Sequence, residues 1–486
     1  MKLARYSLLA TAACVLVAGC AVGPDYKRPE ATSRMPDSYA GATNQWKIAE
    51  PQAHLPKGAW WEIFGDSELN SLEVDAAAAN QELKAAVAGF DEARAVADVA
   101  RSGLLPHIGL AGTATRQGDS RNRPLNGRPA GSSQAPTYYD FTLPLNLTYE
   151  VDLWGRVRRS VESARAQEQA SADDIESIKL EIQTEVAVDY FTLRALDAEK
   201  ALLSSSVEVF RKSLDLTQNR RAGGIASDLD VAQAETVLKT TQAQLPATML
   251  QRAQFEHALA VLTGRAASTF AVAEQPLDIP PPAIPAGLPS ELLERRPDVA
   301  AAERRMASAN ANIGVAKAAF FPTIQFNGMA GFESINASTL VNWSSRFWSV
   351  GPSLMVPLFD AGQNSANLRA ARAAYDQTVA NYRQSVLTAF ADVEDNLSAQ
   401  GLLSIQTDAQ NAALQAARKQ LEIADNRYRA GLVTFLEVAT AESTALDVER
   451  TAVQLRGQQL VAAVTLVKSL GGGWQTTTQP SRAANR

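Results

Sequence analysis

The chain has 486 residues with 46 basic and 52 acidic side chains, so its formal net charge at pH 7 is −6. This acidic balance disfavours a nucleic-acid partner. With only 2 cysteines the chain has no framework of disulfides, so its stability must come from the burial of apolar side chains.

The first 19 residues are typical of an export signal. Lys2 and Arg5 precede an apolar stretch, residues 6–18, which is too short to be a membrane span. The stretch ends in Leu-Val-Ala-Gly before Cys20, which resembles the lipobox of bacterial lipoproteins. We therefore expect cleavage before Cys20 and lipidation, including a palmitate, on that residue.

An ordinary signal peptide followed by an incidental cysteine is the alternative to a lipid anchor. In either case Cys14 leaves with the signal, so the mature chain has no internal disulfide. Alanine at position 21, in place of aspartate, favours sorting to the outer membrane, again by resemblance to lipoproteins.

Short helices are expected next, over about Glu68–Ser102, and they lead into a first pair of strands. Tyr139–Leu153 alternates strictly between apolar and polar residues, while His107–Arg116 alternates more weakly. A period of two places one face of a strand in an apolar environment and the other in water. The polar segment Gln117–Pro136 between the strands is expected to be a solvated loop.

The second half repeats this order. A helix over about Arg296–Ala319 precedes strands that start near Ile324 and at Trp348, with the loop Ser334–Ser345 between them. Any membrane crossing would need a closed β-barrel, because no segment after Cys20 has about 18 uninterrupted apolar residues. Four strands are too few to close one, so the barrel would be shared between subunits; two soluble hairpins are the alternative.

A long segment occurs twice in the chain. A displacement of 207 positions aligns Gly155–Gly264 with Gly362–Gly471 without a gap. Each copy begins with apolar residues at helical spacing over some 65 residues, which would make a rod of roughly 100 Å. A second long helix follows a glycine-containing turn. The repeat therefore predicts two helical hairpins, with a solvated coiled coil as the alternative reading.

Proline marks the connection between the halves, Gln275–Leu288, which is expected to be extended and to lie on the surface. The expected division of the chain is a signal peptide (1–19), a lipidated extended segment (20–67), first-half short helices (68–103), strands 1 and 2 (104–153), hairpin repeat 1 (155–264), a Pro-rich linker (265–289), second-half short helices (290–320), strands 3 and 4 (321–359), hairpin repeat 2 (362–471) and a C-terminal tail (472–486).

Several motifs carry a resemblance to a known family. They are Cys20–Pro29, Trp60–Leu69, Tyr149–Arg156, Leu288–Val299, Ala318–Pro322 and Pro357–Gly362. In this order they resemble outer-membrane efflux factors of the TolC/OprM type, in particular the NodT-like lipoproteins that serve resistance-nodulation-division (RND) pumps. The resemblance covers essentially the whole mature chain.

The resemblance implies an α+β fold and a homotrimer in the Gram-negative outer membrane. Four strands from each subunit would form a shared twelve-stranded transmembrane β-barrel, and the paired hairpins would form a long periplasmic α-helical barrel. The implied partners are outer-membrane lipid, a periplasmic adaptor (membrane fusion) protein and an inner-membrane pump of the RND type. The pump would supply the energy for multidrug efflux, the channel would only conduct, and no cofactor is implied.

The resemblance also places the gate and the docking site at the hairpin turns. The gate residues expected there are Asp230, Arg427, Tyr428, Arg429, Leu436, Glu437 and Thr440. On a threefold axis, Asp230 and Glu437 would each give a ring of three carboxylates, with Arg427 and Arg429 as partners and Tyr428 and Leu436 as plugs. Thr440 stands where the family often has a further aspartate, so the acidic ring is single or shifted.

The adaptor is expected to dock on the turns themselves. The residues assigned to this role are Arg220, Ala222, Gly223, Gly224, Arg429, Ala430, Gly431 and Leu432. Glycine permits the turn and the close approach of another helix tip. A solvated helix end is the alternative reading for any of these charged residues.

No catalytic constellation is recognisable, so we expect no enzyme activity. His54, His107 and His257 are far apart in the sequence, and neither a metal-ligand cluster nor a phosphate loop is present. The alternative functions are an exit duct for type I protein secretion, a metal efflux duct, and a non-conducting periplasmic coiled-coil scaffold lipoprotein. The shortage of Met and His argues against metals.

Overall fold

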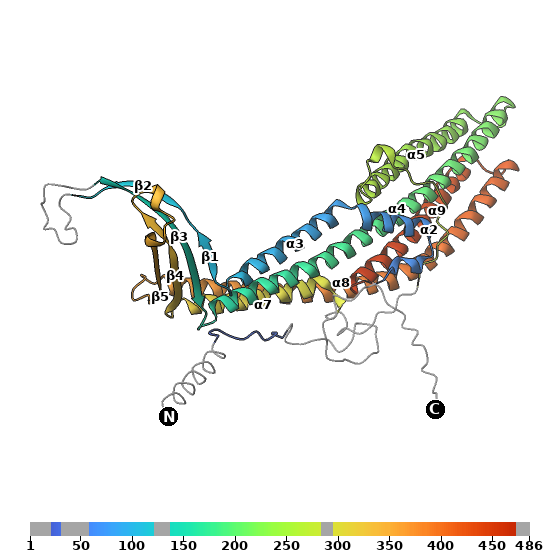
Figure 1. Cartoon of the computed structure of the whole chain (residues 1–486). Coiled ribbons are helices and arrows are strands. Elements are labelled where there is room, and N and C mark those ends of the chain that lie inside the picture. Colours follow the sequence, from blue (N-terminus) through green and yellow to red (C-terminus); the bar gives the residue numbers. More distant parts are fainter. Residues whose placement is uncertain (1–20, 31–57, 121–136, 283–294, 473–486) are drawn as a thin grey trace, which may run out of the picture. The chain divides into compact units, whose positions relative to one another are not determined.

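The computed structural model describes residues 21–30, 58–120, 137–282 and 295–472 (Figure 1). The expected signal peptide, Cys20 and most of the C-terminal tail lie outside these residues, as does most of the first loop between strands. The chain forms two compact units. Unit 1 comprises residues 1–29, 90–170 and 302–382, and unit 2 comprises residues 30–89, 171–301 and 383–486.

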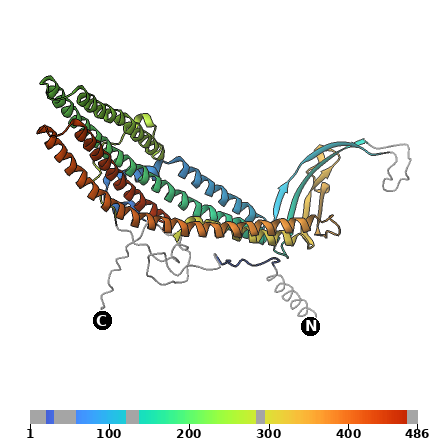
Figure 2. The ribbon, with the colours of Figure 1, turned by 180° about the vertical axis from the view of Figure 1, so that it is seen from behind.

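The sheet belongs to unit 1 and is antiparallel throughout, with the order β1, β3, β4, β5 and with β2 also paired to β3. Figure 2 shows its strands from behind. The bounds are β1 His107–Leu110, β2 Thr113–Gly118, β3 Thr137–Val151, β4 Thr323–Ser334 and β5 Arg346–Met355. Two short 3-10 helices, η3 (Ala337–Thr339) and η4 (Trp343–Ser345), join β4 to β5.

The first expected strand is interrupted, and Pro144 explains why. β1 and β2 pair with β3 in one continuous register, from His107 opposite Thr148 to Gly118 opposite Thr137, which places Ala111 opposite Pro144. The Ala111 N–H donates to the Pro144 carbonyl over 3.0 Å. The return bond cannot form because proline has no N–H, so the prediction of one unbroken strand is wrong at this point.

Part of the N-terminal segment packs against the helices of unit 1, to which it belongs. The Asp25 carboxylate lies 2.7 Å from the Arg159 guanidinium, and the Tyr26 hydroxyl donates to Glu303 over 3.1 Å. Glu303 belongs to helix α7 (Pro297–Ala318). A Cβ on Gly23 would come within 2.5 Å of the Gly314 Cα, so the chain lies directly on this helix.

The segment 20–67 is not extended throughout, which corrects the expectation. Trp60–Phe64 forms a 3-10 helix, η1, whose aromatic rings are buried in the core of unit 2. The expected helix near Glu68–Ser102 is divided into α2 (Ser67–Ala79) and α3 (Gln81–Ser102). Asn80 causes the break: its Oδ1 accepts from the N–H groups of Glu82 and Leu83, and its Nδ2 donates to the Leu262 carbonyl.

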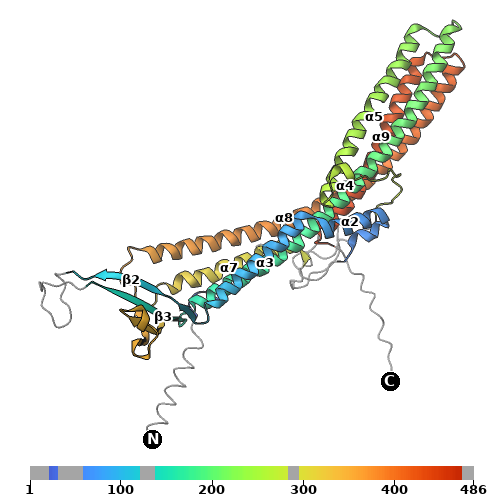
Figure 3. The same cartoon turned by 45° about the horizontal axis from the view of Figure 1, so that its top comes forward.

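Four long helices form the repeat, and Figure 3 shows the parts of them that belong to unit 2 side by side. They are α4 (Arg156–Ala222), α5 (Asp228–Leu262), α8 (Gln363–Arg429) and α9 (Phe435–Ser469). α4 and α8 have 67 residues each, and α5 and α9 have 35 each. The first and last residues of α8 and α9 are 207 positions after those of α4 and α5. We call α4 and α5 hairpin 1, and α8 and α9 hairpin 2.

The expected helical hairpins are thereby confirmed. At about 1.5 Å per residue, the longer helices measure roughly 100 Å. Among the described helices, none combines the length and the hydropathy that crossing a membrane requires.

A buried ionic network ties hairpin 1 to the segment that follows it. Asp197 lies 3.0 Å from Arg194 and 2.6 Å from Arg252, and its side chain is only 2% exposed. Arg194 and Arg252 also donate to the carbonyls of Ala273 and Val272. We call Arg194, Asp197 and Arg252 the Asp197 network.

The segment 270–282 has no regular secondary structure, and only part of it lies on the surface. Phe270, Val272 and Leu277 are buried in the core of unit 2. The expectation of a surface-lying linker is therefore wrong at Leu277, because this apolar side chain is covered despite the surrounding prolines. The short 3-10 helix η2 (Ala267–Thr269) precedes the segment.

Candidate functional site

The two hairpin turns have the same backbone geometry. Gly224 and Gly431 both have a φ of 73°, which is the left-handed region that favours glycine. The N–H of the residue after each glycine, Ile225 or Leu432, donates back to Arg220 or Arg427 over 2.8 and 3.0 Å. These are Schellman ends of α4 and α8. A Cβ on either glycine would meet no atom within 4 Å, so both turns are open on their outer side.

Asp230 joins the two hairpins. Its Oδ2 accepts hydrogen bonds from the Ser227 N–H and hydroxyl, each over 2.8 Å, which closes a capping box at the start of α5. Its Oδ1 accepts from the Phe435 N–H, the first residue of α9, over 3.1 Å. Partial burial acts to raise the pKa of Asp230, but the hydrogen bonds from Ser227 and Phe435 outweigh it and hold the pKa below its usual value. Asp230 is thus a fixed anionic contact between hairpins.

Tyr428 lies between the hairpins in the same region. It is 4% exposed, its ring packs edge-on against Phe435 with centroids 5.4 Å apart, and its hydroxyl donates to Thr217 over 3.4 Å. The Arg220 guanidinium lies 4.6 Å from the centre of the Tyr428 ring and donates to the Arg429 carbonyl over 3.3 Å. These contacts of Tyr428 and Arg220 hold α4 against hairpin 2, and we call them the Tyr428 seam.

The remaining charged residues pair within their own hairpins. Arg427 lies 3.3 Å from Glu437, and both side chains are about half exposed. Arg429 pairs with Asp425 one turn earlier in α8, over 2.9 Å. In hairpin 1, Arg221 pairs with Asp228. The counterparts of Arg221 and Asp228 in the repeat are Tyr428 and Phe435, so the same two positions hold an ion pair in one turn and an aromatic pair in the other.

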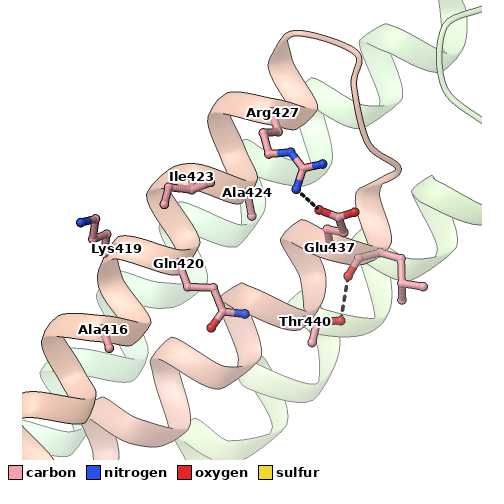
Figure 4. Close-up of a pocket in the computed structure, with 9 residues that line it drawn as sticks. Ala416, Lys419, Gln420, Ile423, Ala424, Arg427, Glu437 and Thr440 are labelled. Carbon is pink, nitrogen blue, oxygen red and sulfur yellow. Dashed lines mark hydrogen bonds and ion pairs between the residues drawn. The ribbon is translucent and has the colours of Figure 1, made fainter.

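Two grooves run back from the turns. The first groove, of about 690 Å³, lies between α8 and α9, and the Arg427–Glu437 pair lines one end of it (Figure 4). Lys419 and Gln420 line it further along α8, together with the half-exposed Ile423. A second groove of about 530 Å³ separates α5 from α9. Thr440 lines both grooves and therefore lies on the ridge between them.

Comparison with known proteins identifies the family. A family model described as "Outer membrane efflux protein" matches residues 72–265 and 288–472. The chain belongs to the outer membrane efflux protein family. This efflux protein has two long helical hairpins whose turns carry the candidate site.

Relatives and solved structures agree with this membership over nearly the full length. The chain is 34% identical to the probable efflux pump outer membrane protein SepC of Pseudomonas putida, with 98% of this chain and 99% of SepC covered. It is 33% identical to the pyoverdine export outer membrane protein OpmQ of Pseudomonas aeruginosa, with 99% of both chains covered. The solved structure of the outer-membrane channel OprN is 31% identical, with a TM-score of 0.82 over 94% of this chain and 100% of OprN.

The structure brings most of the expected site residues together at the turns of the efflux protein. Leu436, Leu432, Ala222, Gly223 and Ala430 are exposed there. Tyr428 is buried between the hairpins, and Arg429 pairs with Asp425 and not with Asp230 or Glu437. Thr440 donates to the Leu436 carbonyl within α9. Cys20 lies outside the described residues.

Glu442 is a functional candidate that the sequence interpretation missed. It lies in α9, it is 4% exposed, and its Oε2 has no hydrogen-bond partner. Burial raises its pKa from 4.5 to about 7; the nearby Asp425 adds to the shift, and a hydrogen bond with Ser213 opposes it. The aligned Glu235 of hairpin 1 is exposed, so the residue type alone does not show which of the two glutamates is buried.

The free energy of unfolding of the efflux protein should therefore fall as the pH rises from 4.5 to about 7, between the unfolded and folded pKa values of Glu442. Between pH 4.5 and about pH 7 the folded protein retains a proton that the unfolded chain releases, so each increase in pH favours unfolding, and the full penalty is present above that range. Glu442→Gln should raise the free energy of unfolding above pH 7 by up to about 3 kcal/mol and leave it nearly unchanged at low pH. Thermal unfolding of the detergent-solubilised protein at about pH 4 and pH 8 measures this.

The matched control for Glu442 is Glu235→Gln, at the aligned exposed position. It should leave the pH dependence of unfolding as in the wild type. An unchanged pH dependence in Glu442→Gln would contradict the assignment.

Metal binding has no candidate site in the described part of the chain. Within residues 21–30, 58–120, 137–282 and 295–472, no group of three or more His, Cys, Asp or Glu side chains is placed to hold a metal ion.

Proposed function

We propose that this efflux protein is the outer-membrane channel of a tripartite efflux system. It conducts small molecules passively from an inner-membrane pump of the RND type, through a periplasmic adaptor, to the cell exterior. Family membership and the full-length similarity to efflux pump outer membrane proteins support the proposal. Relatives are named for toluene, antibiotic and pyoverdine efflux, which favours drugs or toxic organic compounds as substrates.

The assembly that we propose is a homotrimer. In the described sheet, one edge of β1 and β2 and one edge of β5 have no strand beside them, so each edge is available to another copy. Apolar side chains on β5, among them Trp348, Val350 and Leu354, are more than half exposed in the single chain. Three copies joined at these edges would close twelve strands and place such side chains against lipid. Lipidation at Cys20 would add an anchor.

The hairpin turns are proposed as the gate and the adaptor-docking site. In the closed state, Asp230 and the Tyr428 seam hold hairpin 2 against hairpin 1, while the exposed Arg427–Glu437 pair joins α8 to α9 within hairpin 2. The exposed glycine turns, with Leu432 and Ile225 beside them, offer open surface to an adaptor. An exposed ion pair contributes little by itself, so the buried seam is the stronger part of the closure.

A deletion and fractionation experiment tests this function. Deleting the gene should raise the accumulation of a hydrophobic fluorescent dye and the sensitivity to toluene, and the intact chain should restore both. The protein should appear in outer-membrane fractions as a heat-modifiable trimer. A chain that fractionates as a soluble monomer after Cys20→Ala, and whose deletion leaves accumulation unchanged, would contradict the proposal.

A further inference from the structure

Two further grooves lie on opposite sides of helix α4, close to the sheet. One is lined on α4 by Arg156 and Ser160, and we call it the Arg156 groove. The other is lined on α4 by Arg158 and Arg165, and we call it the Arg165 pocket. At 3.6 residues per turn, the second pair of side chains lies nearly opposite the first around the helix. All residues of both grooves belong to unit 1.

The Arg156 groove is formed against the polar face of the sheet. Its strand residues include His107, Thr148, Glu150 and Gln325. The register pairs these four residues two by two, and Thr148 and Glu150 are two positions apart, so the four side chains share one face. Leu145 and Leu147 of β3 lie on the opposite, apolar face, because successive side chains alternate. The Arg165 pocket is therefore on the side of α4 that continues the apolar face of the sheet.

The Arg165 pocket has a volume of about 440 Å³ and presents several cationic groups. Its charged lining residues are Arg158, Arg165, Arg304 and Glu162. Arg158 is positioned by Asp152 over 3.3 Å, and Arg304 by Glu303 over 2.8 Å. A guanidinium has five N–H donors, more than these contacts use. Arg165 is exposed and has no hydrogen bond or ion pair among the described residues, so its charge is available to an anion.

Apolar side chains lead from the Arg165 pocket onto the sheet. Leu104 lines the pocket and is exposed, as are Ile108 and Leu110 of the following strand. Ile108 and Leu110 lie opposite Leu147 and Leu145, so they belong to the apolar face. A free phosphate ion gains nothing from this surface, whereas a phospholipid presents a phosphate and acyl chains together.

The Arg165 pocket also lies at the depth of lipid headgroups. Arg158 contacts Asp152, the residue that follows the end of β3, so the pocket begins where the sheet ends. Arg165 is seven residues further along α4, about 10 Å, and helix side chains tilt towards the N-terminus, here towards the sheet. Headgroups add roughly 5–8 Å to each side of the hydrocarbon core. Tyr26 also lines the pocket, and a lipid anchor on Cys20 would be within about 20 Å of it.

We propose that the Arg165 pocket binds the phosphate of an anionic phospholipid in the periplasmic leaflet of the outer membrane. Arg165 contacts the phosphate oxygens together with Arg158 and Arg304, and the acyl chains extend past Leu104 along the sheet. The proposal rests on the proposed function, because it takes the apolar face of the sheet to lie against lipid. The bound lipid joins α4, α7 and the N-terminal segment, and it fixes the depth of the channel in the membrane.

Native mass spectrometry of the full-length trimer in detergent, titrated with phosphatidylglycerol, tests the site. Phosphatidylglycerol should bind more tightly than phosphatidylcholine with the same acyl chains. Arg165→Ala should weaken the binding of phosphatidylglycerol about fivefold, which is the effect of one arginine beside an anionic lipid surface. It should leave the binding of phosphatidylcholine unchanged. Because Arg165 is exposed, the variant should fold as the wild type does, which thermal unfolding checks.

Arg372→Ala is the matched control, because Arg372 is the aligned residue of α8, is also exposed and does not line the Arg165 pocket. It should leave the affinity for phosphatidylglycerol as in the wild type. Equal affinity for the two lipids, or equal effects of Arg165→Ala and Arg372→Ala, would overturn the proposal. Inorganic phosphate that displaces phosphatidylglycerol at equal concentration would also overturn it, because the pocket would then take free anions. Bilayer conductance of the same trimers separates the two proposals, since a trimer that conducts but binds both lipids equally loses only the lipid site.

Discussion

Asp197→Ala is expected to lower the free energy of unfolding by about 3–5 kcal/mol, because it leaves two buried arginines without their shared carboxylate. The side chains of Arg194 and Asp197 are both 2% exposed, so water cannot replace the lost contact at this site. The segment that contains Val272 and Ala273 should detach at the same time, since its carbonyls are held by the same arginines. Thermal unfolding of the detergent-solubilised protein, with limited proteolysis near residue 273, measures both effects.

The repeat supplies the control for Asp197. Ser404→Ala alters the aligned position in hairpin 2, where the side chain is exposed, and should change the free energy of unfolding by less than about 0.5 kcal/mol. Equal stability of Asp197→Ala and Ser404→Ala would show that the buried network does not stabilise hairpin 1.

Asp230→Ala is expected to open the tip. The substitution removes the capping box at the start of α5 and the bond from the Phe435 N–H, which is a contact between the hairpins. The lost capping box affects α5 equally in the open and closed states, so it does not change closure. A hydrogen bond to a charged group contributes about 1.5–3 kcal/mol, so loss of the bond from Phe435 should weaken closure by about 2 kcal/mol. That loss corresponds to a roughly thirtyfold rise in the ratio of open to closed trimers. Single-channel recording of the open probability measures it.

Glu437→Ala is the matched control for Asp230, because it removes the aligned carboxylate of hairpin 2. Among the described residues, the Glu437 side chain is paired with Arg427 alone, and this pair is exposed, so its loss should change closure by less than about 1 kcal/mol. If Glu437→Ala opened the channel as much as Asp230→Ala, the closure would depend on a ring of charges and not on the contact between hairpins.

Much of the fold is predictable from the sequence because the signals are local. Each rod ends at a glycine turn, and Gly224 and Gly431 do adopt the left-handed conformation that only glycine readily supports. The ungapped repeat extends to the helix bounds themselves, since the same turn and cap positions occur in both copies. Apolar alternation likewise located β3, β4 and β5.

The departures come from contacts that a sequence pattern does not encode. Pro144 interrupts the partner strand opposite it, an effect that appears only when the register is known. Asn80 lies between two helices, and its side chain donates a hydrogen bond to the Leu262 carbonyl, 182 positions away in the sequence.

The sequence predicts which candidate residues lie at the hairpin turns but not which partners they contact. Similar residues at the turns, such as Asp230 and Glu437, have different partners, because one contacts the other hairpin and the other only its own. Tyr428 and Glu442 are buried by packing between hairpins, which depends on which helix faces which. Residue type and spacing do not determine which helix packs against which.

Planar-bilayer recording of the purified full-length trimer shows whether this chain is a conducting channel that is closed at its hairpin turns. We expect brief, infrequent conductance steps for the wild type and long-lived open steps of the same unitary size for Asp230→Ala. Asp230→Ala trimers that remain folded but produce no conductance steps would contradict it.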